Sequence, residues 1–306
     1  MTVDDAALAA ALGRVPWLAG APAHDARRLA GMTNRNYLVE HSGGRYVVRL
    51  PGAGTAEYID RRQEEVAARS ASAAGVNVEL LHFDPADGLM VTRFVDGAAT
   101  MDPDRFADLD AVGRAARAFH RLHTTATPFA DDFVLFPMIG GYKELLASKG
   151  ARLPDGYDEV QARASVVQVV MEARPVPLVP SHCDPLCENF LDAGERMYLI
   201  DYEYSGNNDP MWDLGDLSVE GAFSEAQDRA LLAAYFDGAV PPEQHARMVV
   251  YKAMCDLLWT LWGVIQHVNG NPVDDFWAYA VRRFERCQAL MATPAFAEHV
   301  EVLRCP

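Results

Sequence analysis

The sequence predicts an α+β fold with two lobes, and three observations support this prediction. Strand-like segments separated by turn residues are concentrated in the first 97 residues, whereas helical patterns dominate residues 98–306. The run Val95-Asp-Gly97 breaks the strand pattern between these two parts. With 306 residues, half of them hydrophobic, the chain can bury a substantial core. We therefore expect a small lobe at 1–97 and a large, mainly helical lobe at 98–306.

The small lobe is expected to contain one sheet and one long helix. A short helix at Asp4–Leu12 is ended by Gly13, and Ser42-Gly43-Gly44 marks a tight hairpin turn. Pro85 and Gly88 mark a second hairpin. The expected strands are His24–Ala30, Asn36–His41, Arg45–Leu50, Val78–Phe83 and Leu89–Phe94, with a helix at Ile59–Ala74.

The large lobe is expected to be a set of helices around one hairpin. Asp102 and Pro103 suit the start of a helix that runs to His123. His120 and His123 share a face of this helix, as two metal ligands could, but the third and fourth ligands of a metal site are missing from the sequence around them. The other expected helices are Tyr142–Ser148, Gly156–Ala173, 209–220, Glu225–Phe236, Glu243–Val268 and Val273–Met291.

Charge and cysteine content limit the possible partners and compartment. The formal net charge of −16 argues against nucleic acid or an anionic membrane, and it suits a small cationic substrate. Five scattered cysteines do not form a disulfide framework, so we expect a reducing, cytoplasmic setting. The first residues, Met-Thr-Val-Asp-Asp, lack a signal-peptide pattern. The apolar segment Met248–Val268 carries Lys252, Asp256 and Gln266, which predicts a buried helix and no membrane span.

One stretch concentrates the chemistry. Asp184 lies in a loop, Asn189 follows five residues later, and Asp201 stands just past a predicted hairpin whose turn contains Gly194. Phosphoryl transfer needs such a set: one carboxylate takes the proton of an attacking hydroxyl, while hard oxygen ligands hold Mg²⁺ on the nucleotide phosphates. Two alternatives remain from these residues alone. Asp and Asn also cluster in plain turns, and His182, Cys183 and Cys187 could be zinc ligands, although no second Cys or His pair accompanies them.

The longer string resembles a known family. His-x-Asp-x4-Asn, a hairpin, Asp-x-Glu-Tyr and then Asp209-x2-Trp-Asp213 resemble the choline/ethanolamine kinase branch of the kinase-like phosphotransferases. The resemblance implies a protein-kinase-like fold, ATP and Mg²⁺ as cofactors, and transfer of the γ-phosphate to a hydroxyl. It also implies that Asp184 is the base, that Asn189 and Asp201 bind the metal, and that Asp213 anchors the loop around Asp184. Because the family ends the helix at Pro103–His123 with a similar Leu-His, it further implies a structural hydrogen bond for His123.

The resemblance extends to the predicted small lobe. The loop Gly31–Asn36 could be a plain hairpin turn, or its small residues could present backbone N–H groups to phosphates, as the resemblance implies for Thr33, Asn34 and Asn36. Arg49 lies in an apolar run, so it either faces solvent or needs a partner. The resemblance implies that Arg49 contacts the phosphates and pairs with a helix glutamate. Glu64 is the first choice for this glutamate, and Glu65 is its rival. Alternatively, both glutamates lie on a solvated face of the helix. The linker around Phe94 would meet the adenine.

An aromatic group near the C-terminus is the expected acceptor site. Trp259 and Trp262 lie three residues apart, and Tyr279 keeps the separation from Trp262 that the resembling kinases have. Rings at helical spacing are also typical of a core. The resemblance adds Tyr204 and Glu220, with Asp184 facing the acceptor hydroxyl. A quaternary ammonium group has no N–H to donate, so it is held by ring faces and a carboxylate. This favours choline.

Other acceptors and another function class stay open. Ethanolamine keeps three N–H donors and gains more from added acceptors. Leu186 and Asp216 depart from the family pattern near the acceptor and leave its identity open among choline, ethanolamine, thiamine and an aminoglycoside. A non-catalytic protein that binds a quaternary ammonium compound is the alternative from a different class.

Overall fold

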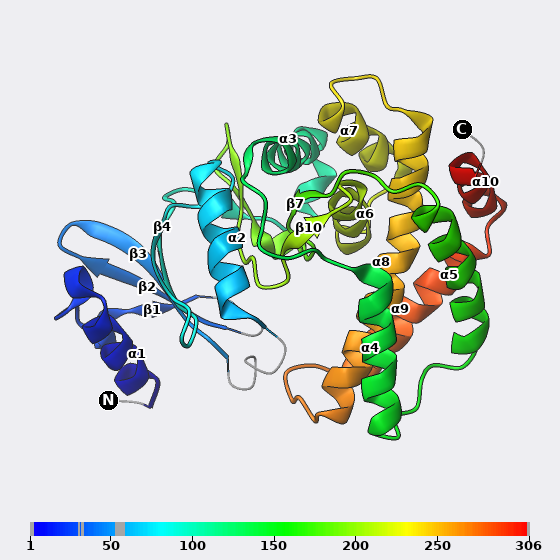
Figure 1. Ribbon diagram of the computed structural model, residues 1–306. Helices are drawn as coiled ribbons and strands as arrows, with labels where there is room; N and C mark the ends of the chain where they lie inside the picture. Colours follow the sequence, from blue (N-terminus) through cyan, green and yellow to red (C-terminus); the bar gives the residue numbers. More distant parts are fainter. Residues whose placement is uncertain (1–2, 30, 32–33, 53–58, 305–306) are drawn as a thin grey trace.

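In the computed structural model the small lobe is an antiparallel sheet with a helix on one face. The structure describes residues 3–29, 31, 34–52 and 59–304. Five strands lie in the order β1-β2-β3-β5-β4. Helix α1 packs its apolar side, including Leu8 and Leu12, on Val48 and Val91 of the sheet (Figure 1). The elements are α1 (Val3–Arg14), β1 (Arg27–Arg28), β2 (Arg35–His41), β3 (Gly44–Leu50), β4 (Leu80–Asp84) and β5 (Leu89–Arg93).

Helix α2 (Arg61–Ala73) stands between this sheet and the large lobe (Figure 1). The side chain of Asp60 caps it by accepting hydrogen bonds from the N–H groups of Arg62 and Gln63. Its small residues Ala67, Ala68 and Ala71 belong to the main core of the large lobe. The helix therefore fastens the small lobe to the large one and holds Glu64 at the junction.

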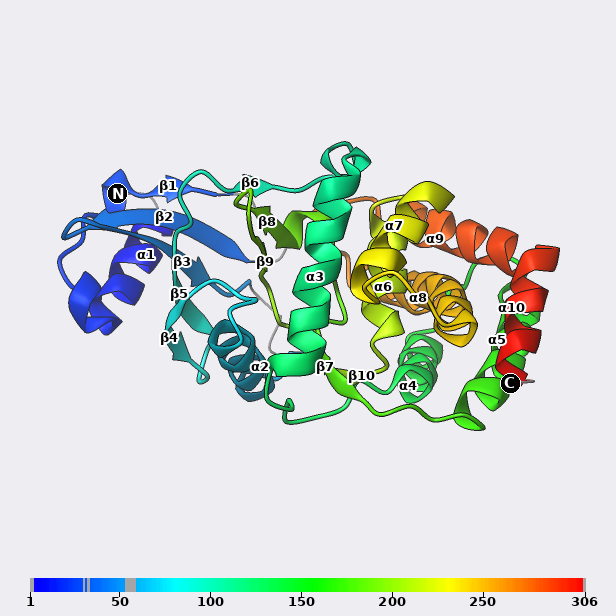
Figure 2. The same cartoon turned by 90° about the horizontal axis from the view of Figure 1, so that it is seen from above.

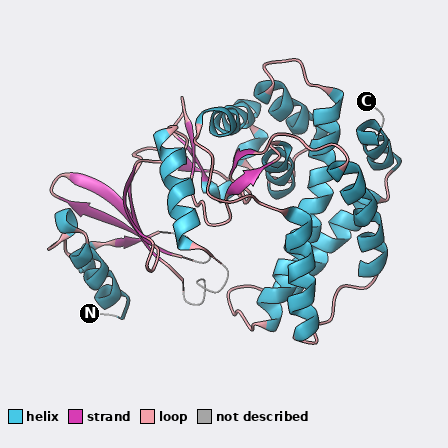
Figure 3. Cartoon of the chain, viewed as in Figure 1, coloured by secondary structure: helices cyan, strands magenta, loops and turns pink. Residues whose placement is uncertain are grey.

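The large lobe is built from helices around two small sheets. In Figure 3 the strands of these sheets lie where the two lobes meet, and Figure 2 shows α3 running alongside β8 and β9. The sheets have the orders β6-β8-β9 and β10-β7. Their strands are β6 (Ala99–Thr100), β7 (Val179–Ser181), β8 (Phe190–Asp192), β9 (Met197–Leu199) and β10 (Gly206–Asn208). The helices are α3 (Leu109–Thr125), α4 (Leu135–Ser148), α5 (Tyr157–Glu172), α6 (Met211–Glu220), α7 (Glu225–Tyr235), α8 (Pro242–Val268), α9 (Phe276–Met291) and α10 (Pro294–Arg304).

Helix α8 is the central support of the large lobe. Among the described residues it is the one helix that is long and apolar enough to cross a membrane, and 83% of its most apolar 18-residue stretch is buried inside the molecule. It packs against α6, α9, α4 and α10. The prediction that this segment is a buried helix is confirmed.

Several predicted elements differ from the structure. The helix predicted from Pro103 begins only at Leu109, because Asp108 is the residue that caps it; Asp102 instead accepts from the N–H of Arg105 in a short 3-10 turn. The predicted strand at His24–Ala30 is a 3-10 turn followed by the two-residue β1. Helix α4 begins seven residues before its predicted start at Tyr142, and α10 was not predicted.

Candidate active site

The loop after β7 is held in a strained shape by one buried carboxylate. Cys183 has a backbone φ of 68°, which residues other than glycine rarely adopt. The N–H groups of His182 and Cys183 each donate to Asp213 at 2.8 Å, and a ring nitrogen of His123 lies 3.0 Å from the same carboxylate. The anchoring hydrogen bonds predicted for Asp213 are thus present, and His123 has the structural hydrogen-bonding role predicted for it.

The same loop and the β8–β9 hairpin bring Asp184, Asn189 and Asp201 together. The N–H of Ile200 donates to the carbonyl of Asn189 at 2.9 Å, which sets Asn189 beside the residue before Asp201. The Asn189 side-chain amide donates to the Asp184 carbonyl at 3.1 Å. Asp201 itself has a φ of 71°. The cluster of three oxygen-bearing side chains thus includes one strained residue, Asp201, and begins directly after another, Cys183.

Burial and crowding raise the pKa values of both carboxyl groups in this cluster. Desolvation, followed by the negative charge of Glu220, raises the pKa of Asp184 to about 7, although Arg283 opposes the shift. Desolvation and then Glu203 raise the pKa of Asp201 well above its ordinary value, against the pull of Arg49. Both groups would gain from a cation placed between them.

Arg49 joins the two lobes through buried ion pairs. Its guanidinium lies 2.5 Å from Glu64 and 3.3 Å from Asp201. Glu65, the rival partner, instead pairs with Arg69 at 2.7 Å. Because the side chains of Arg49 and Glu64 are 3% and 1% exposed, the pair is shielded from water. The helix glutamate that faces Arg49 is therefore Glu64.

Glu203 and Arg61 belong to the same network and were not predicted. Glu203 Oε1 lies 2.8 Å from Arg61 and 3.3 Å from Arg49, and it accepts from the Asn34 side chain at 2.6 Å. Arg61 also contacts Glu64 at 2.6 Å. The spacing Asp201-x-Glu203 was visible in the sequence, but nothing in it showed that Glu203 turns toward the small lobe.

Of the remaining residues predicted for the nucleotide, Asn34 and Asn36 adjoin this network, whereas Phe94 contacts Arg45. Asn34 is buried, and its side-chain oxygen accepts from the N–H of Gly52 at 3.2 Å. Asn36 pairs with Arg49 in the register of β2 and β3. The N–H of Phe94 donates to the carbonyl of Arg45, whose guanidinium lies 4.4 Å from the Phe94 ring centre. Thr33 lies outside the described residues.

The donor set fits the magnesium ion that this chemistry needs. Asn189 and Asp201 offer oxygen ligands, as Mg²⁺ prefers. Carboxylate oxygens of Glu64, Asp201 and Glu203 lie within 4.8 Å of one another, with Arg49 and Arg61 paired to them. The pKa of Asp201 is raised in spite of Arg49, so a further cation beside its carboxylate would be favoured. The cysteines of the loop, Cys183 and Cys187, are buried free thiols. Cys183 Sγ contacts the carbonyls of Ser181 and Gly206, as expected of a structural thiol.

The predicted acceptor rings form a continuous chain of edge contacts. Ring centres are 5.4 Å apart for Tyr204 and Trp259, 6.2 Å for Trp259 and Trp262, and 5.8 Å for Trp262 and Tyr279. The indole N–H of Trp262 donates to the Tyr204 hydroxyl at 3.2 Å. Trp259 is 3% exposed, so it supports its two neighbours from the core side, whereas Trp262 is partly exposed.

Charged groups next to these rings were only partly predicted. Glu220 accepts a hydrogen bond from Arg283, whose guanidinium lies 4.7 Å from the Tyr279 ring centre. Arg283 was missed, although it follows Tyr279 by one helical turn. Asp216 is fully buried and accepts from the Cys255 thiol through Oδ1 at 2.8 Å, while its Oδ2 has no hydrogen-bond partner among the described residues.

Comparisons with known proteins agree on one family. The phosphotransferase enzyme family matches residues 25–251. A solved choline/ethanolamine kinase family protein from Mesorhizobium loti is 50% identical, with a TM-score of 0.90 over 98% of this chain and 99% of its own. Choline kinase LicA from Streptococcus pneumoniae is 29% identical, with a TM-score of 0.76 over 88% and 93%. Protein LicA from Haemophilus influenzae is 28% identical over 85% of this chain and 98% of its own length. These superpositions confirm the predicted α+β fold class.

Proposed function

The chain belongs to the phosphotransferase enzyme family, and from this premise we propose that it is an ATP-dependent kinase of choline or a similar amino alcohol. It is a phosphotransferase with an alcohol group as acceptor, and the resemblance to choline/ethanolamine kinases inferred from the sequence is confirmed. The acceptor, the cofactor set and the role of each residue are our proposal.

The position of Asp184 between two differently built sites carries the proposal. On one side its carbonyl accepts from Asn189, and its charge acts on Asp201. On the other side its carboxyl group feels the charges of Glu220 and Arg283, and it acts in turn on the Tyr279 hydroxyl. One carboxylate thus lies within electrostatic reach of both a hard-oxygen cluster and an aromatic group, as transfer of a phosphoryl group to a cationic alcohol requires.

In this proposal each group has one task. Asp184 accepts a hydrogen bond from the acceptor hydroxyl and takes its proton as the oxygen attacks the γ-phosphate of ATP. Asn189 and Asp201 hold Mg²⁺, which would neutralise charge on the phosphates. Arg49, fixed by Glu64, would contact the phosphates with its remaining N–H groups. Asn34 and Asn36 line the approach from the small lobe, and the chain segment at Phe94 would meet the adenine.

The rings of Tyr204, Trp262 and Tyr279 would hold the ammonium group. A ring face contributes about 0.5–2 kcal/mol toward a cation, and it does so without needing an N–H donor. Trp259 fixes the ring of Tyr204 from the core side. This arrangement favours choline.

One observation favours a second acceptor class. The buried Oδ2 of Asp216 has no described partner, and carboxylate oxygens of Asp216 and Glu220 lie within 4.8 Å of each other. A buried acceptor atom without a donor is costly, so an ammonium group with N–H donors, as in ethanolamine, would satisfy it where choline would not. Ethanolamine is therefore the second candidate.

An ADP-release assay over choline, ethanolamine, thiamine and kanamycin, with and without Mg²⁺, tests the proposal. We expect ADP formation with choline or ethanolamine in the presence of Mg²⁺, and a loss of several orders of magnitude in Asp184→Asn. Near-normal turnover in that variant would refute the role of Asp184. Betaine or choline binding with no ADP from any acceptor would instead favour the non-catalytic alternative.

The proposed compartment follows from the free cysteines, and the proposed partners follow from the net charge. Four described cysteines are free, which suits a reducing compartment, and we place the protein in the cytoplasm. The net charge of −16 suits a small cationic acceptor as partner and gives no support for a nucleic acid or an anionic membrane.

A further inference from the structure

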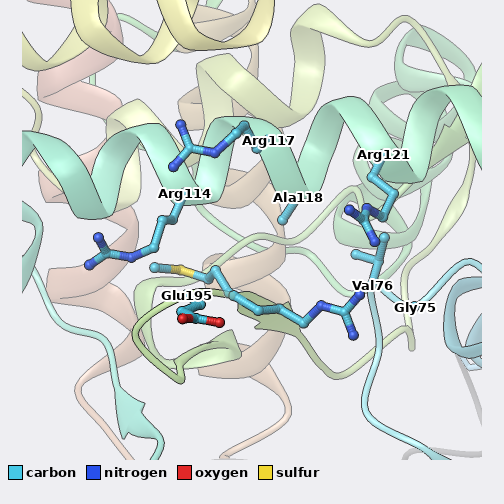
Figure 4. A pocket seen from close by; sticks show the side chains of 9 residues that line it. Gly75, Val76, Arg114, Arg117, Ala118, Arg121 and Glu195 are labelled. Carbon is cyan, nitrogen blue, oxygen red and sulfur yellow. The ribbon is translucent and has the colours of Figure 1, made fainter.

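A pocket away from the proposed catalytic cluster has four arginines among its nine lining residues. It has a volume of about 110 Å³ and lies between the loop after α2, helix α3 and the β8–β9 hairpin. Arg114, Arg117 and Arg121 come from successive turns of α3 (Figure 4). Arg196 comes from the hairpin between β8 and β9. Glu195 adds one carboxylate to the lining. Four cations thus gather in one place on a chain whose acidic residues outnumber the basic ones by 43 to 27.

Most of these cations lack a counter-ion in the described part of the chain. Arg114 is paired with Asp192 at 2.6 Å. Arg117, Arg121 and Arg196 form no ion pair with any described residue, and Glu195 pairs with none of them. The pocket therefore has a surplus of positive charge.

Two of the unpaired guanidinium groups converge on one point. A Cβ atom on Gly75 would lie 3.4 Å from Nη2 of Arg196 and 3.9 Å from Nη1 of Arg121. Gly75 has a φ of 70° and leaves this space open. Two like charges that face the same small space repel each other, unless an anion lies between them. A phosphate group fits such a pair, because planar guanidinium groups bind its oxygens through paired N–H donors.

The pocket also touches the segments that carry the proposed nucleotide site. Gly75 and Val76 follow directly on α2, the helix of Glu64. The N–H of Leu199 donates to the carbonyl of Val76 at 3.0 Å and ties this loop to the hairpin. The hairpin strands begin at Phe190, just after Asn189, and end at Leu199, just before Ile200 and Asp201. An anion here would bridge α3 and the hairpin.

We propose that this pocket binds a phosphate group, separately from the proposed catalytic site, with Arg121 and Arg196 as its main ligands. The phosphate is supplied either by the inorganic ion or by a small phosphate ester. Arg117 adds charge at the rim, and Arg114 is kept in place by Asp192.

Calorimetric titration of the full-length protein tests this site. The protein is first saturated with Mg²⁺ and a non-hydrolysable ATP analogue, so that the proposed nucleotide site is occupied. Inorganic phosphate and phosphocholine are then titrated separately, which distinguishes the free ion from an ester. We expect one site for at least one probe, and a loss of affinity of about tenfold or more in both Arg121→Gln and Arg196→Gln.

The matched control is Arg105→Gln, which removes an exposed arginine that pairs with Asp102 outside the pocket. It is expected to bind the probe as the wild type does. All three substitutions are of exposed residues, and circular dichroism checks that each variant is folded. The proposal is overturned if the wild type binds neither probe, if Arg121→Gln and Arg196→Gln bind it unchanged, or if Arg105→Gln weakens binding as much.

Discussion

The guanidinium of Arg283 lies 4.7 Å from the centre of the Tyr279 ring and donates a hydrogen bond to Glu220. The carboxylate and one of the rings predicted to hold a cationic acceptor are thus already engaged by a cation of the chain itself. In the proposed acceptor site an incoming ammonium group would have to share Glu220 with Arg283, and the rings of Tyr204 and Trp262 would be its further contacts.

This relationship predicts a strong effect of Arg283 on stability. Arg283→Met leaves Glu220 without its buried partner, whereas Asp256 keeps Arg286 at 2.6 Å. Removing one partner of a buried pair typically costs about 3–5 kcal/mol, so we expect a loss of that size in the free energy of unfolding measured in urea. Adding Glu220→Gln to Arg283→Met removes the uncompensated charge and should restore part of the loss. A double variant no more stable than Arg283→Met would contradict this account.

Glu64 and Glu65 form a matched pair for testing the junction of the lobes. Glu64→Gln removes the buried charge next to Arg49 and Arg61, so we expect the KM for ATP to rise about tenfold or more as Arg49 loses its fixed position. Glu65→Gln removes only a partner of Arg69 on the same helix, and its free energy of unfolding should change by about 0.5 kcal/mol or less. Equal effects of both substitutions on the KM for ATP would exclude the proposed role of Glu64.

Local sequence patterns predicted most of the helices and strands, and the wrong start of α3 has a local cause. Two candidate caps compete before α3, and the structure uses Asp108, six residues after Asp102. The catalytic-type triad could be recognised because its residues lie within 18 positions of one another, on a loop and a hairpin. The contacts of Glu203 with Arg61 and of Arg283 with Glu220 could not be predicted, because these partners are distant in sequence and only the packing of α2 and α9 brings them together. The pocket at Gly75 likewise depends on α3 meeting the hairpin.

The raised pKa of Asp184 predicts two pH effects. A general base acts only when deprotonated, so kcat/KM for the acceptor should fall as the pH drops below about 7, where the carboxyl group of Asp184 takes up its proton. Bound cations would move this limb to lower pH. The folded state also binds this proton more tightly than the unfolded chain, so the group's contribution to stability is lost as the pH rises through about 7.

Asp184→Asn separates these effects because it cannot titrate. We expect it to lose activity at every pH and to have a higher Tm than the wild type at about pH 8, where the wild-type carboxyl group is charged and partly buried. At about pH 5 the two Tm values should approach each other, because Asp184 is then neutral. A Tm difference between the two proteins that does not depend on pH would show that Asp184 has an ordinary pKa.

Trp262 and Trp277 allow a comparison of one ring inside the proposed acceptor site with one outside it. Trp262 contacts Tyr204 and Tyr279, whereas the Trp277 ring packs against His267 and lies near Arg152. Because a ring face gives a cation about 0.5–2 kcal/mol, Trp262→Leu should raise the KM for a cationic acceptor between about twofold and thirtyfold and leave the KM for ATP unchanged. Trp277→Leu should change neither value. If Trp262→Leu raised both KM values equally, the ring would be acting through the packing of the lobe, and the aromatic acceptor site would have to be placed elsewhere.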